Sequence, residues 1–219
     1  MIGPMLGHLA YASVIVLLAS LVPPALLGEA AAGLLVVGII GTWRYGWAAI
    51  NFTRAVMFRR WVYPRRKARA MAAYAAKPLQ AHAYFLTTSY KIEPEVTLPV
   101  YRSIFTAAAN SDAGATIVAS VVDGADERLI RQIFATSPED MTGVRLIVDR
   151  IPGTGKRDAL ARSLNLIARR CPTRHDVVLF VDGDSCVPPD VVAQSAPFFT
   201  NPKVGALTTD EAVSIPQPG

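Results

Sequence analysis

Charged residues are scarce at the start of this chain. From Met1 to Trp43 the only formally charged side chain is that of Glu29, although charged residues make up 18% of the whole chain and hydrophobic residues 52%. Such a stretch is too apolar for an ordinary soluble domain, whereas the sequence after Trp43 has a usual soluble composition. The missing charge therefore argues against a wholly soluble protein and predicts a membrane segment attached to a globular part.

Cysteine is also scarce, and several catalytic motifs are missing. Cys171 and Cys186 form no dense framework and have no zinc spacing, so disulfides and a zinc site find no support. There is no Gly-x-Ser-x-Gly, His-Glu-x-x-His or Gly-x-Gly-x-x-Gly, which removes support for hydrolase, zinc-peptidase and dinucleotide-binding classes. Gly155-Lys156 resembles part of a P-loop, but Arg150 and Arg157 stand where that motif needs Gly and Ser or Thr.

Acidic residues are absent from the next segment. Between Arg44 and Lys91 there are ten Lys or Arg and no Asp or Glu, whereas residues 92–219 carry twelve cations against sixteen acids, a net charge of −4. A uniformly basic nucleic-acid binder would not divide its charge in this way, so no nucleic-acid partner is expected. The division favours a basic segment beside anionic membrane lipid, where each cation contributes about 1 kcal/mol, followed by a mildly acidic cytosolic domain.

Two apolar runs occupy the first fifty residues. Residues 4–22 and 25–43 each span close to the roughly 20 residues that cross a bilayer, and Pro23-Pro24 separates them. The cations that follow the second run place that side in the cytoplasm. We therefore predict a transmembrane hairpin over residues 1–50, in a multi-pass protein of the bacterial inner membrane whose soluble domain is cytoplasmic. A signal peptide is the alternative, but no Lys or Arg precedes the first run.

Residues 51–78 are predicted to be a basic interfacial or juxtamembrane segment. Apolar and aromatic residues, among them Val56, Met57 and Trp61, are interleaved with the arginines over residues 51–75. This mixture is typical of an amphipathic helix that lies on a membrane surface. A solvated basic linker is the alternative interpretation.

Residues 79–219 alternate between strand and helix patterns. Strands are predicted at residues 84–90, 115–122, 144–148, 176–181 and 204–208, and helices at residues 99–109, 126–134 and 158–169. This alternation with short connections indicates an α/β domain with a parallel sheet covered on both faces. In such sheets ligands bind outside the carboxyl ends of the strands, so the residues that follow each strand are the candidate site.

Two carboxylates follow the strand predicted at residues 176–181. Asp182 and Asp184 flank Gly183, which allows a sharp backbone turn. Two carboxylates at such a turn suit Mg²⁺ or Mn²⁺, which prefer oxygen ligands and share their coordination with substrate phosphates. An Asp-x-Asp pair is common in loops, but its place at the end of a buried strand makes a metal site at Asp182 and Asp184 the stronger interpretation.

Other charged residues follow earlier strands. Asp123 would accept a hydrogen bond from a nucleobase, and its alternative is a turn former or an acid at a helix start. Lys156 and Arg157 follow the Pro152–Gly155 stretch, predicted to be a mobile loop that brings both cations to a pyrophosphate. The alternative, a basic helix start, is electrostatically unfavourable.

These residues form an ordered set along the chain. The pieces are Thr88-Ser89-Tyr90, Val121-Val122-Asp123-Gly124, Gly155-Lys156-Arg157-Asp158-Ala159-Leu160, Val181-Asp182-Gly183-Asp184 and Val204-Gly205-Ala206-Leu207-Thr208-Thr209. The set resembles the family 2 inverting glycosyltransferases of the processive, membrane-embedded kind, which include cellulose, hyaluronan, chitin and mannuronan synthases. Within that group the two-span start and the Thr-Ser-Tyr piece are most similar to the mannuronan synthases, the bacterial alginate polymerases.

The resemblance implies a partial GT-A (Rossmann-like) nucleotide-sugar binding domain and a role for each candidate. Asp123 would contact the base and Tyr90 would stack on it, Lys156 and Arg157 would contact the diphosphate, and Asp182 with Asp184 would hold the metal and donor. The implied partners are a GDP- or UDP-linked sugar, a growing polysaccharide, membrane lipid and subunits of a polymer export complex.

Two family motifs do not occur in residues 1–219. Neither the Thr-Glu-Asp that supplies the general base nor the Gln-x-x-Arg-Trp acceptor motif is present, and inverting transfer needs a base beside the acceptor oxygen. We therefore expect the N-terminal portion of an exopolysaccharide-polymerising glycosyltransferase that binds donor but is inactive alone. The alternative is a non-catalytic, membrane-anchored subunit that binds a nucleotide or a partner.

Overall fold

The structure, a computed structural model, describes residues 3–21, 23, 29–78, 80–89 and 93–209. The chain divides into two compact units, Met1–Arg66 and Lys67–Gly219. Its helices are α1 (Gly3–Ser20), α2 (Glu29–Met57), η2 (Phe58–Val62), α3 (Tyr63–Ala76), α4 (Pro94–Ala109), α5 (Gly124–Ala135), α6 (Lys156–Ala168), α7 (Val191–Ser195) and η3 (Ala196–Thr200). Its strands are β1 (Ala83–Ser89), β2 (Ala115–Val121), β3 (Val144–Arg150) and β4 (Val177–Asp182).

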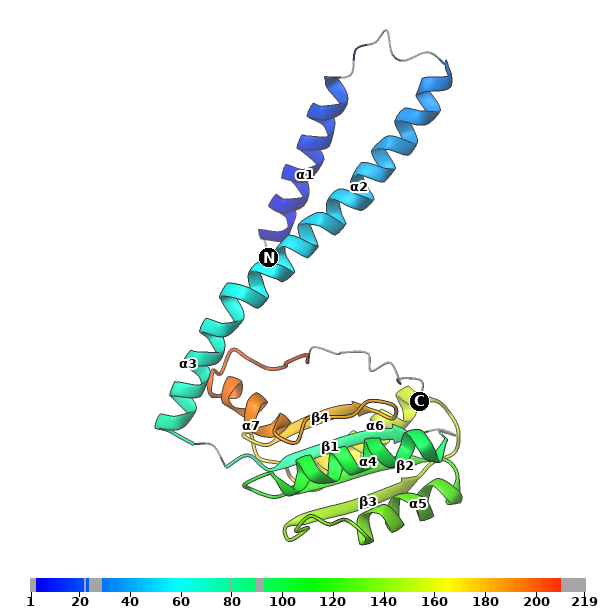
Figure 1. The fold of residues 1–219 in the computed structure, drawn as a ribbon, viewed down its shortest axis with the longest axis vertical. Coiled ribbons are helices and arrows are strands. Elements are labelled where there is room, and N and C mark those ends of the chain that lie inside the picture. Colours follow the sequence, from blue (N-terminus) through cyan, green and yellow to red (C-terminus); the bar gives the residue numbers. More distant parts are fainter. Residues whose placement is uncertain (1–2, 22, 24–28, 79, 90–92, 210–219) are drawn as a thin grey trace, which may run out of the picture. The chain divides into compact units, whose positions relative to one another are not determined.

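In the first unit, α1 and α2 lie antiparallel and side by side (Figure 1). The Tyr11 hydroxyl joins them, since it lies 2.7 Å from the carbonyl oxygen of Thr42 and 2.9 Å from that of Trp43. A Cβ at Gly46 would lie 2.2 Å from the Tyr11 hydroxyl oxygen, so this close approach requires glycine. Within the described ranges, no helix is both long enough and apolar enough to cross a membrane.

The second helix continues beyond the predicted end of the hairpin. Residues 51–76 are helical, as the sequence predicts, but they continue α2 without a break. The π-helical turn η2 precedes Pro64, whose nitrogen has no hydrogen to donate to the carbonyl four residues earlier. The Tyr63 N–H instead donates to the carbonyl of Phe58, five residues earlier. The helix thus accommodates Pro64 by widening one turn rather than by ending.

The second unit is built on a parallel sheet with the strand order β3-β2-β1-β4. Helices α4 and α5 cover one face, where Phe85, Tyr101 and Ile104 lie fully buried in the larger core. Helix α6 covers the other face and packs on Leu86 and Val118. Because both faces are covered, the strands are rich in buried β-branched and aliphatic residues. The predicted parallel α/β domain is confirmed.

Two element predictions are wrong in detail. Residues 204–208 do not form a strand, because they pair with none of the four strands and have irregular backbone instead. Helix α4 begins at Pro94, five residues before its predicted start. Proline at the first helical position carries no N–H that needs a partner, and its fixed φ suits a helix start. The later Pro99 lies inside the helix, where the apolar pattern alone suggested a beginning.

Candidate functional site

The candidate site lies at the carboxyl edge of the sheet. From β1 to β3 each new strand is added on the same side of the sheet. The chain then returns, and β4 pairs with the other edge of β1, so the direction of winding reverses between β1 and β4. At such a switch point the loops diverge and leave a crevice in which α/β proteins bind ligands. Thr88 of β1 is paired in register with Asp182 of β4. The topology therefore places the first carboxylate of the Asp-x-Asp pair at the switch point.

An ion pair joins two of the predicted site residues. The Lys156 ammonium nitrogen donates to Asp182 Oδ1, although the residues are 26 positions apart in the sequence. Their side chains are 59% and 54% exposed, and exposed ion pairs contribute about 0–1 kcal/mol to stability. The pair therefore contributes little to folding, and both charges remain accessible to a ligand.

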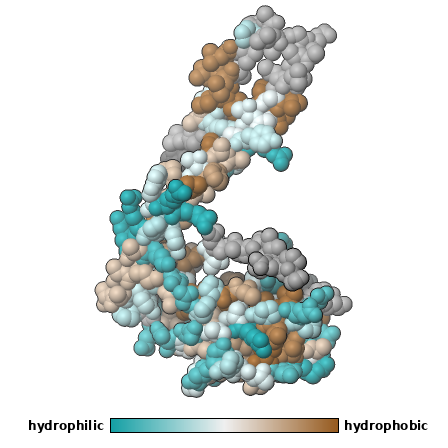
Figure 2. Space-filling view, in the orientation of Figure 1, coloured by the Kyte–Doolittle hydropathy of each residue, from teal (hydrophilic) through white to brown (hydrophobic). Residues whose placement is uncertain are grey.

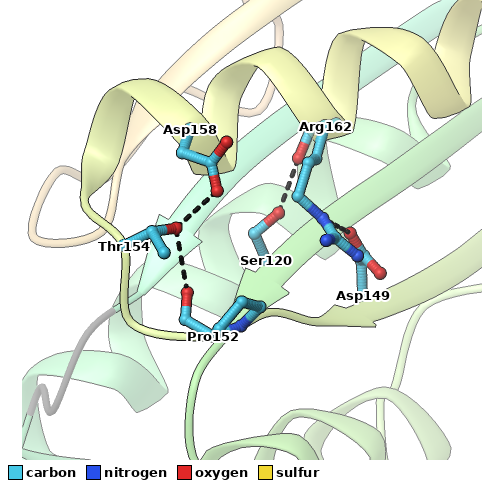
Figure 3. Close-up of polar contacts among 7 residues, drawn as sticks. Ser120, Asp149, Pro152, Thr154, Asp158 and Arg162 are labelled. Carbon is cyan, nitrogen blue, oxygen red and sulfur yellow. Dashed lines mark hydrogen bonds and ion pairs between the residues drawn. The ribbon is translucent and has the colours of Figure 1, made fainter.

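The loop before α6 is tied to that helix. The Thr154 hydroxyl donates to the Asp158 carboxylate and also lies 3.2 Å from the carbonyl oxygen of Pro152 (Figure 3). Gly155 has φ +113°, a conformation that other residues rarely adopt, and it precedes the helix directly. The contacts of Thr154 and the glycine together fix the point at which α6 starts.

Lys156 and Arg157 are the first two residues of α6, so the helix begins two residues before its predicted start at Asp158, and the alternative interpretation of a basic helix start describes their position. A basic helix start is unfavourable because the helix dipole is positive there. Asp182 offsets the charge of Lys156, and Asp158 adds a carboxylate in the same first turn. Both cations are exposed at the N-terminus of the helix, where the backbone N–H groups and the helix dipole favour an anion.

Side-chain contacts that join α6 to β2 and β3 lie deeper in the same region. Ser120 of β2 and Ser163 of α6 are buried with their hydroxyl oxygens 2.6 Å apart. The Arg162 Nε atom lies 3.5 Å from an Asp149 carboxylate oxygen (Figure 3). These contacts hold α6 against the sheet, so the position of Lys156 relative to β4 is set by the fold.

Asp123 caps helix α5. Its Oδ1 atom accepts the backbone N–H of Ala125 at 2.9 Å, while the side chain remains exposed. The alternative interpretation, an acid at a helix start, thus describes its contact within the chain. Gly124 follows, and a Cβ there would lie 2.3 Å from an Arg150 guanidinium nitrogen. Arg150, which ends β3, therefore covers this helix start.

Asp126 is a half-buried carboxyl that the sequence analysis did not single out. Its Oδ2 atom is buried and has no hydrogen-bond partner among the described residues. Burial raises the pKa of Asp126, and the nearby Asp123 charge raises it further. The only sequence signal is its place three residues after Asp123, which is the spacing of a capping box.

A buried hydroxyl pair supports the end of β1. The hydroxyl oxygens of Ser89 and Tyr101 are 2.9 Å apart, and burial raises the pKa of Tyr101 to about 12. Tyr101 lies on α4, so this contact ties the helix to the last residue of the strand. Tyr90, the predicted stacking residue, lies outside the described residues.

The Asp182 and Asp184 pair fits one type of metal site. Across the part of the chain that is described, no group of three or more His, Cys, Asp or Glu side chains is placed to hold a metal ion. A metal cage built from protein side chains alone therefore does not fit. Mg²⁺ commonly binds one or two carboxylates and takes its other ligands from phosphate and water. Two exposed carboxylates after a strand suit such a shared site.

Comparison with known proteins gives a family and two relatives. Residues 81–217 match the model of the family described as "Glycosyltransferase like family 2". The chain is 36% identical over 214 residues to the glycosyltransferase alg8 of Pseudomonas syringae pv. tomato, which covers 95% of this chain and 42% of that protein. It is 35% identical over 202 residues to the glycosyltransferase alg8 of Azotobacter vinelandii, covering 90% of this chain and 40% of that protein.

The chain thus spans about two fifths of the length of the curated relatives it matches. The family match covers the whole parallel sheet and every charged candidate residue from Asp123 to Asp184. With its Rossmann-like sheet of the GT-A type, this chain belongs to glycosyltransferase family 2.

Proposed function

We propose that this chain is the donor-binding portion of a membrane glycosyltransferase that polymerises an exopolysaccharide from a nucleotide sugar. The observation that carries the proposal is the pairing of Lys156 with Asp182 at the switch point of a family 2 domain. Both side chains are exposed there. Their opposite charges suit a ligand that combines a metal ion with a diphosphate. The cation attracts phosphate oxygens and the carboxylate attracts the metal.

Different residues at the carboxyl edge bind different parts of the nucleotide-sugar donor. Lys156 and Arg157, with the N-terminus of α6, bind the diphosphate oxygens. Asp182 and Asp184 would hold Mg²⁺ or Mn²⁺, which as a Lewis acid would neutralise the charge of the departing diphosphate. Because Lys156 and Asp182 pair with each other in this structure, a bound donor would compete with that ion pair for both side chains. Asp123 accepts a hydrogen bond from the base, and Tyr90 stacking remains a prediction.

The 219-residue chain binds donor but does not transfer sugar. Support comes from its sequence, which contains neither the Thr-Glu-Asp nor the Gln-x-x-Arg-Trp motif. Without a base to take the proton from the acceptor hydroxyl, inverting attack is slow even when the donor is activated. The polymer is polymannuronate, a proposal that rests on the Thr-Ser-Tyr piece, the two-run start and the resemblance to alginate polymerases.

The first unit anchors the chain as a transmembrane hairpin in the bacterial inner membrane. Support comes from the two apolar runs of the sequence and from large apolar side chains that face outward on both helices. Val16, Leu17 and Val37 are 68%, 61% and 67% exposed. Exposed apolar surface of this extent marks a partner or a membrane. The arginines after α2 support a cytoplasmic location for the second unit.

The donor site is tested by nucleotide binding to the whole chain in detergent. Equilibrium dialysis with GDP-mannuronate, GDP and UDP is expected to show saturable binding that needs Mg²⁺ or Mn²⁺. Asp182→Asn keeps the side-chain shape but removes the charge, and is expected to weaken binding about tenfold or more. Asp112→Asn is the matched control, because Asp112 is exposed near the amino end of β2. Equal affinity of the Asp182→Asn and Asp112→Asn variants would falsify the metal assignment.

A further inference from the structure

The helical continuation of α2 carries cations and aromatic side chains that the donor site does not use. We infer that residues 52–66 form a binding surface for anionic phospholipid headgroups. This lipid surface consists of the exposed residues Phe52, Arg54, Phe58, Arg59, Arg60, Trp61, Tyr63, Arg65 and Arg66. The inference rests on the membrane location in the proposed function and goes further by naming the residues that bind the headgroups.

The lipid surface lies in a segment whose sequence is basic throughout. It includes five arginines, and no Asp or Glu occurs between Arg44 and Lys91. Arginines that are crowded on one helix repel one another unless anions lie among them. A guanidinium group binds phosphate through two parallel hydrogen bonds. Phosphodiester headgroups therefore complement this surface in both charge and geometry.

The aromatic side chains distinguish a lipid from a soluble anion. Phe52 and Trp61 are 71% and 56% exposed, which is costly in water but favourable at the level of lipid headgroups. The Arg66 guanidinium carbon lies 5.9 Å from the centre of the Phe58 ring, so cation and ring share one face. Figure 2 shows hydrophilic residues along this continuation and hydrophobic residues along the described part of the two antiparallel helices.

The π-turn contributes to this arrangement. Side chains five residues apart lie about 140° apart around an α-helix, whereas the wider turn of η2 brings them closer to the same face. The ring centres of Phe58 and Tyr63 are accordingly 6.2 Å apart. Pro64, which requires the wider turn, thus gathers two aromatic rings and Arg66 on one side of the helix.

Trp61 offers a direct probe of this surface in the whole chain. The other two tryptophans, Trp43 and Trp47, are replaced by phenylalanine so that only Trp61 emits. The chain is reconstituted in vesicles of phosphatidylcholine alone or of phosphatidylcholine and phosphatidylglycerol in equal parts. We measure the emission maximum of Trp61 and its quenching by a spin label near the headgroups. We expect a blue shift and strong quenching in the phosphatidylglycerol vesicles only, both reversed by high salt.

Two charge variants locate the effect. Arg59, Arg60, Arg65 and Arg66 are changed together to glutamine, which keeps helix propensity. The control changes four exposed arginines of the second unit, Arg145, Arg169, Arg170 and Arg174, to glutamine. Because each cation favours an anionic surface about fivefold, the first variant is expected to reduce headgroup-bound Trp61 at least fivefold, and the control to leave it unchanged.

Three results overturn the inference: equal quenching in neutral vesicles, no loss in the first variant, or the same emission change with a soluble polyanion. The proposed hairpin is tested separately, by washing the membranes with alkaline carbonate and measuring whether the chain stays in the membrane pellet. A chain that carbonate removes, but whose Trp61 still responds to phosphatidylglycerol, contradicts the hairpin and supports the lipid surface. A chain that stays in the pellet after carbonate, but whose Trp61 does not respond to phosphatidylglycerol, supports the hairpin and contradicts the lipid surface.

Discussion

Asp176 at the amino edge of the parallel sheet and Asp182 at its carboxyl edge differ in their contacts. At the amino edge, Asp176 accepts the backbone N–H of His82 at 3.2 Å and both the N–H and the hydroxyl of Thr173 at 2.8 and 2.9 Å. At the carboxyl edge, Asp182 is an exposed carboxylate that pairs with Lys156. Asp176 at the amino edge thus helps to hold the chain together, whereas Asp182 at the carboxyl edge remains accessible to a ligand.

The largest expected effect comes from removing Asp176. Asp176→Ala leaves the N–H of His82 and two donors of Thr173 without this acceptor, which is expected to lower the free energy of unfolding by about 2–3 kcal/mol. Asp182→Ala is expected to change it by less than about 1 kcal/mol, because exposed ion pairs contribute little. Pulse proteolysis in urea measures both. Similar losses in the two variants would remove the distinction between the edges.

Two glycines compare the rigidity of the edges. Gly114 precedes β2 with φ +78°, and a Cβ there would lie 2.9 Å from the Gly143 carbonyl oxygen, so Gly114→Ala is expected to cost about 1–3 kcal/mol. At Gly124 the nearest group is the mobile end of Arg150, which can move away. Gly124→Ala is expected to change stability by less than about 0.5 kcal/mol. The urea midpoints of the two variants test whether Gly114→Ala is the more destabilising. A larger loss of stability in Gly124→Ala would contradict the comparison.

The acids of the two edges differ in pKa. Hydrogen bonds from Ser137 and Thr106 lower the pKa of Glu139, in the loop before β3, whereas burial raises that of Asp126. Because the pKa of Asp126 is higher in the folded than in the unfolded chain, the free energy of unfolding falls as pH rises from the unfolded pKa through the folded pKa. This loss persists at neutral pH. Glu139 behaves oppositely, because its stabilisation is present above its unfolded pKa and is lost as pH falls through the lowered value.

Neutral variants of these acids test the sign. Asp126→Asn is expected to be more stable than the parent at pH 7, by at most about 1 kcal/mol, with the gain disappearing below the unfolded pKa. Glu139→Gln is expected to be less stable at pH 7, with its deficit shrinking as pH falls. Urea midpoints across pH 3–7 measure both slopes, in the range where ordinary carboxyl groups titrate. Parallel slopes for the two variants would contradict the contrast.

The smallest expected effect is the coupling between Lys156 and Asp182. A double-mutant cycle with Lys156→Met and Asp182→Asn is expected to give a coupling in stability of less than about 0.5–1 kcal/mol. The same four proteins are expected to differ at least about tenfold in donor affinity. A large coupling in stability, with unchanged affinity, would make this a structural ion pair.

Much of the fold could be predicted because burial dictates the pattern of each strand. β2 is buried along its whole length and was predicted to within one residue. The segment 204–208 is equally apolar, but a strand also needs a partner, which a local pattern does not reveal. The position of Asp182 at the carboxyl edge could be predicted, because the carboxyl ends of parallel strands meet at one edge of the sheet. Asp126 was not, because its burial depends on how α5 packs rather than on neighbours in the sequence.

The crossover from β3 to β4 also has a consequence for folding. Ala83 of β1 pairs with Val177 of β4, across 94 residues of chain, and such distant pairings form slowly because the loop-closure entropy is lost first. Strands β1, β2 and β3 have shorter separations and can associate while the chain is still being synthesised. Asp182 reaches its place only when the last strand docks. The proposed donor site is therefore complete only in the finished sheet, and a ligand that binds there would selectively stabilise chains that have finished folding.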